Sequence, residues 1–435
     1  MGTLSNVLRC APVLPLFLLA AHTASADPPN WSGVKAVSVA GDVDEGQPIS
    51  LAIGKYGTTF VQYGTKDSTI VTGFAPDGSK LKGASTGFPG QASYGIAAPS
   101  CEDGSPHDVP TVMVDGAASL PGAHEIHVVT QGDEDYSPGS SSGLMLSDSD
   151  PARTLIVGRY QPYNEMTGAQ GTDVFLLVGH MALSGCSLEY DPTSNPLLPD
   201  YFKAKVVALP ATVSSTFSVT ASSRTSTGGA LVGGRDDFKA AFWVGRVNAA
   251  LDLDASAVIS TPTSTGTVLS TNVHGVVEDG AGHVFVCGDA LRQGKEWYNL
   301  VPFGFVAVGD TSLGKFQFVE IATTFGVRTG GCALAPDGQL VVSGWYRGMY
   351  DYDNVADGMD VFLARVRADA SGPTVTSFVG YGTSADEPAV SAPLVTGGGV
   401  LLSGVTHGSW GDASAPNGGP KVFLVRADPT SLDIY

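Results

Sequence analysis

Charged residues are scarce in this sequence, and basic residues are the scarcer kind. Only 15% of the 435 residues are charged, and 23 lysines and arginines stand against 42 aspartates and glutamates, which gives a formal net charge of −19. Nucleic acids and anionic membrane surfaces are bound by basic faces. The composition therefore argues against nucleic acid as a partner.

Long apolar runs are missing as well. No stretch approaches the roughly 18 apolar residues of a membrane-spanning helix, so we expect a protein that does not span a membrane. The short apolar stretch 11–21 follows Arg9 and precedes Ala24-Ser25-Ala26. This pattern is typical of a secretory signal peptide over residues 1–26. We expect cleavage near Ala26 and a mature protein that is secreted, periplasmic or on the cell surface.

Catalytic and metal signatures are absent too. The five cysteines form no C-x-x-C pair, which makes a zinc site improbable. Two G-x-S-x-G matches, at Ser85 and Ser141, lack the strand and helix that a nucleophile elbow needs. His124 and His127 would point to opposite faces of a strand and cannot share a metal, and the other histidines of the mature chain, His274 among them, are isolated along the sequence. We therefore assign no catalytic residue and no cofactor, apart from the Ca²⁺ considered below.

Glycine and short β-rich runs are abundant. The chain holds 56 glycines and is 43% hydrophobic, which argues against disorder. The best-formed stretch has a hairpin signal at Asp337-Gly338, followed by three runs: 340–342 (closed by Gly344), 361–366 and 374–379. Runs this short are typical of strands and indicate an all-β fold.

The glycine that closes the second run recurs along the chain, at Gly64, Gly116, Gly158, Gly233, Gly288, Gly344 and Gly404. A third run follows each marker and reads V-F-L in three copies. The stretch 238–255 has a helical pattern, but its alignment with the third run predicts a strand. Units of about 40–75 residues with up to four strands predict a β-propeller.

We thus predict a seven-bladed β-propeller formed by one domain, residues 27–435. The orphan run 34–39 is expected to supply the missing fourth strand of the last blade, which closes the ring and protects its edges. The predicted blades are 51–94, 95–144, 145–210, 211–275, 276–332, 333–393, and 394–435 together with 31–50.

The D-x-F-L-A run at 360–364, the Gly-rich turns and the G-x-G-x-x-x-D-E segment at 380–387 resemble the bacterial β-propeller repeat family called SBBP. The match is good for 276–435, fair for 145–275 and weak for 27–144. The resemblance implies an exported bacterial protein with seven blades. That family carries no established catalytic residues, so none are transferred.

Repeat positions also bear on the cysteines that remain after cleavage. Cys287 closes a second strand and Cys332 belongs to the next blade's first strand, so both are expected near one face. Cys101 follows a first strand and Cys186 a third, near the opposite face. Of the three possible pairings, this favours disulfides 287–332 and 101–186.

The loops between second and third strands are long in four blades and rich in aromatic residues. Exposed aromatics with acidic neighbours suit a glycan or a protein partner, although these side chains could equally pack over their own loops. The candidate ligand-binding residues are Trp297, Tyr298, Trp345, Tyr346, Tyr350, Tyr352 and Trp410.

One of these loops is strongly acidic. Asp351, Asp353, Asp357 and Asp360 offer the hard oxygen ligands that Ca²⁺ prefers. The spacing departs from an EF-hand loop, so a solvated acidic loop is the preferred interpretation and a Ca²⁺ site is the alternative.

The leading functional hypothesis is a non-enzymatic exported propeller that binds a ligand or partner through this aromatic and acidic loop face. Two alternatives remain open. One is a propeller hydrolase or lyase whose channel-mouth carboxylates act as acid and base. The other is a purely structural surface protein.

Overall fold

The computed structural model is all-β over the residues that it describes. Within these residues, no helix is present and so none has the length and hydrophobicity that a membrane crossing requires. The described residues are 31–37, 43–89, 92–98, 100–101, 107–114, 117–119, 127–130, 140–150, 153–161, 163–164, 169–170, 175–181, 183–184, 187–188, 201–213, 217–236, 240–262, 266–294, 300–321, 326–347, 358–411, 413–414 and 419–435.

Four sheets each hold four antiparallel strands that follow one another in the chain. The first holds β2 (Ser50–Ile53), β3 (Thr59–Gly64), β4 (Ser68–Phe74) and β5 (Lys80–Pro89). The second holds β20 (Phe217–Arg224), β21 (Ala230–Asp236), β22 (Ala241–Val247) and β23 (Leu253–Ser260). The third holds β24 (Val268–Glu278), β25 (His283–Gln293), β26 (Leu300–Asp310) and β27 (Phe316–Ile321). The fourth holds β28 (Val327–Leu334), β29 (Leu340–Arg347), β30 (Met359–Asp369) and β31 (Gly372–Tyr381).

Three further sheets complete the set among the described residues. One holds β6 (Ala92–Ala97), β9 (Thr111–Val114) and β10 (Ala117–Ser119). One holds β12 (Ser140–Asp150), β13 (Arg153–Gln161), β16 (Phe175–Met181), β19 (Tyr201–Ala208) and β11 (His127–Thr130). The last holds β32 (Ala389–Val390), β33 (Leu394–Thr396), β34 (Gly399–Thr406), β37 (Lys421–Ala427) and β1 (Lys35–Ala36). Two-stranded ribbons pair β7 (Ser100–Cys101) with β8 (His107–Asp108), β14 (Tyr163–Asn164) with β15 (Ala169–Gln170), β17 (Leu183–Ser184) with β18 (Ser187–Leu188), and β35 (Ser409–Trp410) with β36 (Ala413–Ser414).

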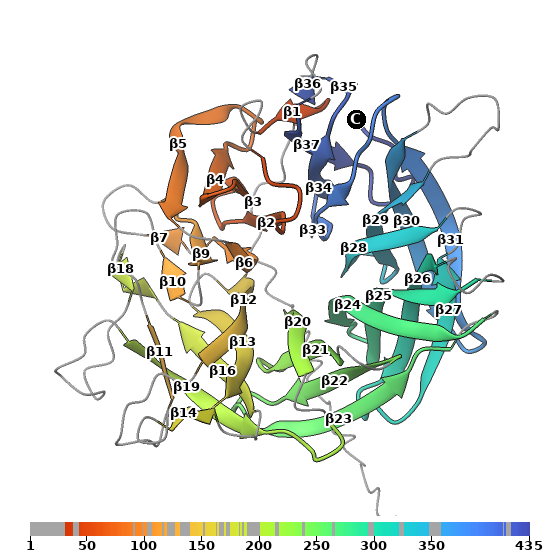
Figure 1. The fold of residues 1–435 in the computed structure, drawn as a ribbon. Coiled ribbons are helices and arrows are strands. Elements are labelled where there is room, and N and C mark those ends of the chain that lie inside the picture. Colours follow the sequence, from red (N-terminus) through yellow and green to blue (C-terminus); the bar gives the residue numbers. More distant parts are fainter. Residues whose placement is uncertain are drawn as a thin grey trace, which may run out of the picture.

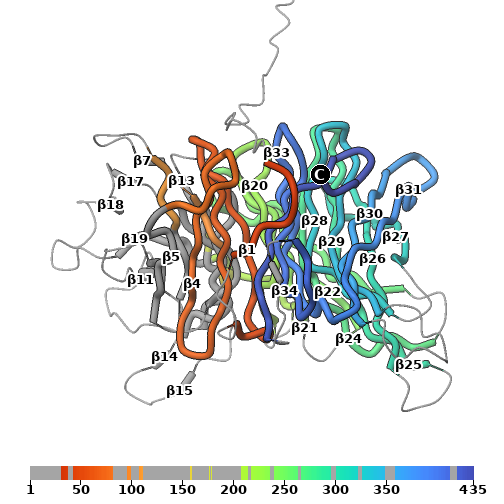
Figure 2. The backbone as a smooth tube through the Cα atoms, turned by 90° about the horizontal axis from the view of Figure 1, so that it is seen from above, coloured from red at the N-terminus to blue at the C-terminus, as the bar shows by residue number. Residues whose placement is uncertain are grey.

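The sheets stand around a common axis (Figure 1). One edge strand of each sheet lies nearest the centre, as β2, β6, β12, β20, β24, β28 and β33 show, while β5, β23, β27 and β31 lie at the rim. Figure 2 shows the strands running across the thickness of the resulting disc. This arrangement is that of a β-propeller and confirms the predicted fold class. The blade count stays a prediction.

The last sheet is built from both ends of the chain. Strand β1 pairs antiparallel with β37, Lys35 opposite Leu424, and Val37 N donates to Val422 O at 2.9 Å. The side chain of Arg426 also donates to Trp31 O at 3.2 Å. The predicted completion of the last blade by the N-terminal run is therefore confirmed.

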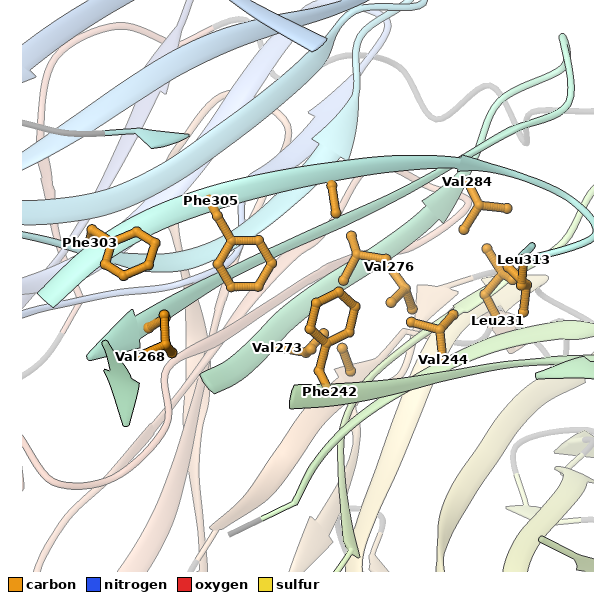
Figure 3. Close-up of a cluster of buried hydrophobic side chains, with 14 residues drawn as sticks. Leu231, Phe242, Val244, Val268, Val273, Val276, Val284, Phe303, Phe305 and Leu313 are labelled. Atoms are coloured by element: carbon orange, nitrogen blue, oxygen red, sulfur yellow. The ribbon is translucent and has the colours of Figure 1, made fainter. Parts of the chain in front are cut away.

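The hydrophobic core lies between neighbouring sheets. One cluster joins β21 and β22 to β24–β26, where the rings of Phe242 and Phe305 stack at 5.5 Å (Figure 3). Similar clusters join the β24–β27 sheet to the β28–β31 sheet, and the latter to the last sheet. Burial on both faces explains why the middle strands read as continuous apolar runs rather than alternating ones.

The marker glycines have a steric cause. Gly288, Gly344 and Gly404 lie opposite a third-strand phenylalanine in the ladder, Phe305, Phe362 and Phe423 respectively. A Cβ at Gly344 would lie 2.1 Å from the backbone oxygen of Arg328 and 2.4 Å from the Phe362 ring. The recurring glycine and the phenylalanine of V-F-L are thus two halves of one packing unit.

The strand pattern departs from the prediction at one important place. The second run was expected to end at Gly344, but β29 continues to Arg347. Trp345 and Tyr346 consequently lie in a strand, paired with Arg328 and Val327 of β28, and not in a loop. The stretch 238–255 contains strand β22, as its repeat position predicted.

Candidate functional site

A cavity of about 440 Å³ occupies the centre of the ring, and we call it the channel. The inner strands β2, β20, β24, β28, β32 and β33 all contribute to its wall, with Ile96 of β6. The wall is mostly apolar. Among its polar and aromatic residues are Gln47, Thr220, Ser222, His274, Thr329 and Trp345, and the described lining contains no carboxylate.

Three inner strands carry a β-bulge where they pass this cavity. The register shifts between Val219 and Ala221, between Val273 and Gly275, and between Thr329 and Gly331. The extra residues are Thr220, His274 and Gly330, and all three line the cavity. Because a bulge changes the direction of its side chain, this irregularity brings His274 to the channel.

A buried carboxylate holds His274 in place. Oδ2 of Asp289, on β25, lies 2.9 Å from Nε2 of His274. Its Oδ1 accepts hydrogen bonds from Nη1 of Arg328 at 3.0 Å and from Nδ2 of Asn272 at 3.1 Å. We call these four residues the Asp289 cluster. It links two neighbouring sheets, because Arg328 lies on β28.

The cluster keeps Asp289 ionised. Burial of this carboxylate, whose side chain is 3% exposed, by itself raises the pKa. The hydrogen bond and charge of His274, the charge of Arg328 and the hydrogen bond from Asn272 outweigh it, so the pKa of Asp289 lies below its ordinary value. The side chains of Arg328 and His274 are 33% and 31% exposed. The positive group therefore faces outward and the negative one inward.

The cluster extends to a third sheet. Nη1 of Arg235, on β21, donates to Oδ1 of Asn272 at 2.9 Å. Arg235 is exposed. Two guanidinium groups thus accompany one carboxylate in this hydrogen-bond network.

Several hydroxyl groups in the channel wall have no hydrogen-bond partner within the described part of the chain. They belong to Thr220, Ser222 and Thr329, and the Thr329 residue is only 4% exposed. Buried hydroxyl groups are normally satisfied. These groups can therefore bind polar atoms of a ligand.

The predicted aromatic residues do not form one surface where they are described. Trp345 lines the cavity, whereas its neighbour Tyr346 is half-buried against Phe362 and Phe378, at ring distances of 6.4 and 5.6 Å. Burial and then the Asp360 carboxylate, by its charge and hydrogen bond, raise the pKa of Tyr346.

Trp410 packs on the Phe423 ring at 4.6 Å. Trp297, Tyr298, Tyr350 and Tyr352 lie outside the described residues. The ligand-binding role assigned to these seven aromatic residues stays a prediction.

The acidic loop is described only at its end. Asp360 lies in β30 and is hydrogen-bonded to Tyr346, and Asp351, Asp353 and Asp357 fall outside the described residues. No group of three or more metal-binding side chains occurs among the residues that the structure does describe. The Ca²⁺ interpretation stays a prediction.

One predicted disulfide is confirmed. Cys287 of β25 is bonded to Cys332 of β28, with a Cα–Cα distance of 6.2 Å, so the bond joins the two sheets that the Asp289 cluster also joins. Cys332 lines the channel. The predicted 101–186 pair cannot be placed, because Cys186 lies outside the described residues.

Sequence reasoning missed the Asp289 cluster. His274 is isolated along the sequence, and Asp289 stands 15 positions further on. One signal was available, since Asp289 directly follows the marker Gly288, a position occupied by Trp345 and Val405 in the next two units. An ionisable residue at a position where the next two units carry an apolar one indicates a local function.

The ring of sheets and its central channel place this chain among the β-propellers. No family model matches it, and no curated protein matches it either. Among solved structures it is similar to virginiamycin B lyase from Staphylococcus aureus, with 10% identity, coverage of 90% of this chain and 99% of that one, and a TM-score of 0.46. It is also similar to the Dos1 propeller, with 10% identity, 92% and 82% coverage and a TM-score of 0.45. A third similar structure is an ulvan lyase of polysaccharide lyase family PL25, with 9% identity, coverage of 92% of this chain and 97% of that one, and a TM-score of 0.43. Similarities this low carry no argument about activity or ligand.

Proposed function

We propose that this protein is an exported β-propeller, built from SBBP-type repeats, that binds a glycan or a protein segment at the mouth of its central channel. The observation that supports this is the cavity of about 440 Å³ in which Trp345 and His274 interrupt apolar walls. Small-molecule sites are concave, mostly apolar and marked by a few placed polar groups. Trp345 offers a ring face to a sugar or an apolar side chain.

Trp345 and Tyr346 provide a matched pair of variants for the test. They are neighbours on β29, but successive side chains of a strand point to opposite faces. The purified full chain is screened on glycan and peptide arrays. Trp345→Ala is expected to abolish the signal, whereas Tyr346→Phe, which keeps the ring packing, retains it. Absence of any signal in the wild type would support the structural surface protein instead.

A second candidate function is enzymatic, because of the contact between His274 and Asp289. A carboxylate that fixes an imidazole leaves the other ring nitrogen available as a general base. Asp289 is buried and ionised, so it suits orientation of His274 better than proton delivery. This candidate replaces the pair of channel-mouth carboxylates by a histidine. Turnover of any array ligand that disappears in His274→Ala while binding persists would favour it.

Export is part of the proposal and has its own test. Residues 1–26 carry the signal-peptide pattern. Mass spectrometry of protein recovered outside the cytoplasm is expected to give an N-terminus near Asp27. Recovery of the uncleaved chain from the cytoplasm alone would contradict export.

A further inference from the structure

The Asp289 cluster places a guanidinium group beside the channel residue His274 in an acidic protein. Two guanidinium groups, Arg328 and Arg235, accompany the Asp289 carboxylate through direct and Asn272-mediated hydrogen bonds. These two guanidinium groups lie close together in a chain that carries a formal charge of −19. A guanidinium group can pair with an anionic group through charge-assisted hydrogen bonds.

The outward groups of the cluster keep hydrogen-bonding capacity. A guanidinium has five N–H donors, and Asp289 takes one of those of Arg328. No further partner of Arg328 or of the second ring nitrogen of His274 occurs among the described residues. Both side chains are about one-third exposed. A planar fork of donors matches the geometry of a carboxylate.

Asp289 also fixes the positions of both groups. Its two oxygens hold His274 and Arg328 at 2.9 and 3.0 Å, so their separation is set before a ligand arrives. Fixed donors lose less entropy on binding than mobile surface side chains do. The cluster is thus preorganised rather than a chance accumulation of surface charge.

The channel wall supplies the remaining chemistry. The hydroxyl groups of Thr220, Ser222 and Thr329 lack partners in the described part of the chain, and Trp345 adds an aromatic face to the same cavity. Hydroxyl groups on a ligand would pair with the former, and the face of a sugar ring would pack on the latter.

We infer that a small polyhydroxylated carboxylate, such as a sugar acid, binds at the edge of the channel, with its carboxylate group on His274, which lines the channel, and on Arg328, which Asp289 holds beside it. This inference rests on the proposed function and names its ligand class. It assigns Arg328 and His274 to the carboxylate, Trp345 to the ring, and Asp289 to positioning.

Calorimetric titration of the full chain tests the inference with D-glucuronate and D-galacturonate, each beside its neutral counterpart, D-glucose or D-galactose. The sugar acids are expected to bind at least about tenfold more tightly, the magnitude of a charged hydrogen bond. D-glucose 6-phosphate distinguishes a carboxylate site from a general anion site. Equal affinity for the phosphate would overturn the carboxylate assignment.

Two variants test whether Arg328 binds the carboxylate group of the ligand. Arg328→Gln is expected to lower sugar-acid affinity about 10- to 100-fold and to leave neutral-sugar affinity unchanged. Arg292→Gln is the matched control, because Arg292 also pairs with a carboxylate, Glu320, at 3.0 Å and is not assigned to the ligand. The comparison of acid with neutral sugar in the wild type needs no variant and remains decisive if Arg328→Gln does not fold.

The outcomes separate the two proposals. If neutral sugars bind as tightly as the acids, and Trp345→Ala abolishes both, the carboxylate inference fails and the channel-binding function stands. If none of the sugars binds but an array ligand does, the sugar-acid inference alone fails. If nothing binds in either experiment, both fail.

Discussion

Nε2 of His274 lies 2.9 Å from Oδ2 of Asp289, so an imidazole that faces the channel is held by a carboxylate that solvent barely reaches. The contact depends on the bulge at His274 and on the inter-sheet position of Asp289. This contact therefore connects the packing of the sheets to the proposed binding site.

Asp289→Asn is the first prediction. The substitution keeps the shape of the side chain but removes the charge that Arg328 and His274 face. We expect a loss of about 1–3 kcal/mol in the free energy of unfolding, because Arg328 is partly solvated. Urea unfolding measures it, with Asp67→Asn in an exposed turn as the control. Equal stability of Asp289→Asn and wild type would show that the cluster contributes nothing.

The same carboxylate gives a pH dependence at the acid end. The folded pKa of Asp289 is lowered from 3.8, so its contribution is present above that value and disappears as the pH falls through the folded pKa. Asp289→Asn is expected to remove this part of the acid-induced loss of stability. If the variant and the wild type lose the same amount of stability as the pH falls, the lowered pKa of Asp289 is contradicted.

For Glu387 we expect the opposite dependence of stability on pH, and at a higher pH. It is fully buried, and burial raises its pKa above 4.5 in spite of hydrogen bonds from Thr406 and Thr383. The folded state therefore holds its proton longer than the unfolded state, and stability falls as pH rises from 4.5 through the folded pKa.

Glu387→Gln is expected to remove that fall, because glutamine does not ionise. Each pKa unit of the shift corresponds to about 1.4 kcal/mol. Thermal unfolding from pH 4 to 8 measures the difference between the two proteins. Parallel pH profiles for wild type and variant would rule out a raised pKa.

The disulfide provides a prediction on stability. Cys287 and Cys332 enclose a sequence separation of 45 residues. Replacing both by alanine is expected to cost about 2–4 kcal/mol, mainly by freeing the unfolded chain. The double variant is compared with wild type by urea unfolding without reductant, which leaves any other cysteine pair unchanged in both proteins. A cost below about 0.5 kcal/mol would contradict a structural role.

The marker glycine gives a steric prediction. Gly344→Ala places a methyl group against the Arg328 backbone oxygen and the Phe362 ring, and overpacking of this kind costs about 1–3 kcal/mol. Gly280→Ala is the control, because no atom lies within 4 Å of the position that a Cβ would take there. Equal unfolding free energies for the two variants would show that the contact with Phe362 does not require a glycine at position 344.

Much of the fold could be predicted because its causes are local. The turn at Asp337-Gly338 requires the positive φ, +80°, that glycine adopts readily. The pairing of Gly344 with Phe362 repeats in later units, so it is visible as a repeat. The end of β29 was missed because Trp345 and Tyr346 are aromatic residues compatible with either a strand or a binding loop.

The site could not be predicted to the same extent because its causes are not local. Arg235, Asn272, Asp289 and Arg328 come from different strands of three sheets. Their meeting depends on the angle between sheets and on a one-residue bulge at His274, which no periodicity in the sequence marks.

The pairing of β1 with β37 has a kinetic consequence. The associated contact between Arg426 and Trp31 spans 395 positions, whereas the disulfide spans 45. Closing the longer loop costs about 2 kcal/mol more, at about 0.6 kcal/mol per doubling of length. This seam is held by hydrogen bonds and packing, without a covalent link between its two strands. We expect this seam to form late in folding and to separate first when the chain is pulled from its ends, so that the ring opens at β1 and β37 before any sheet unfolds.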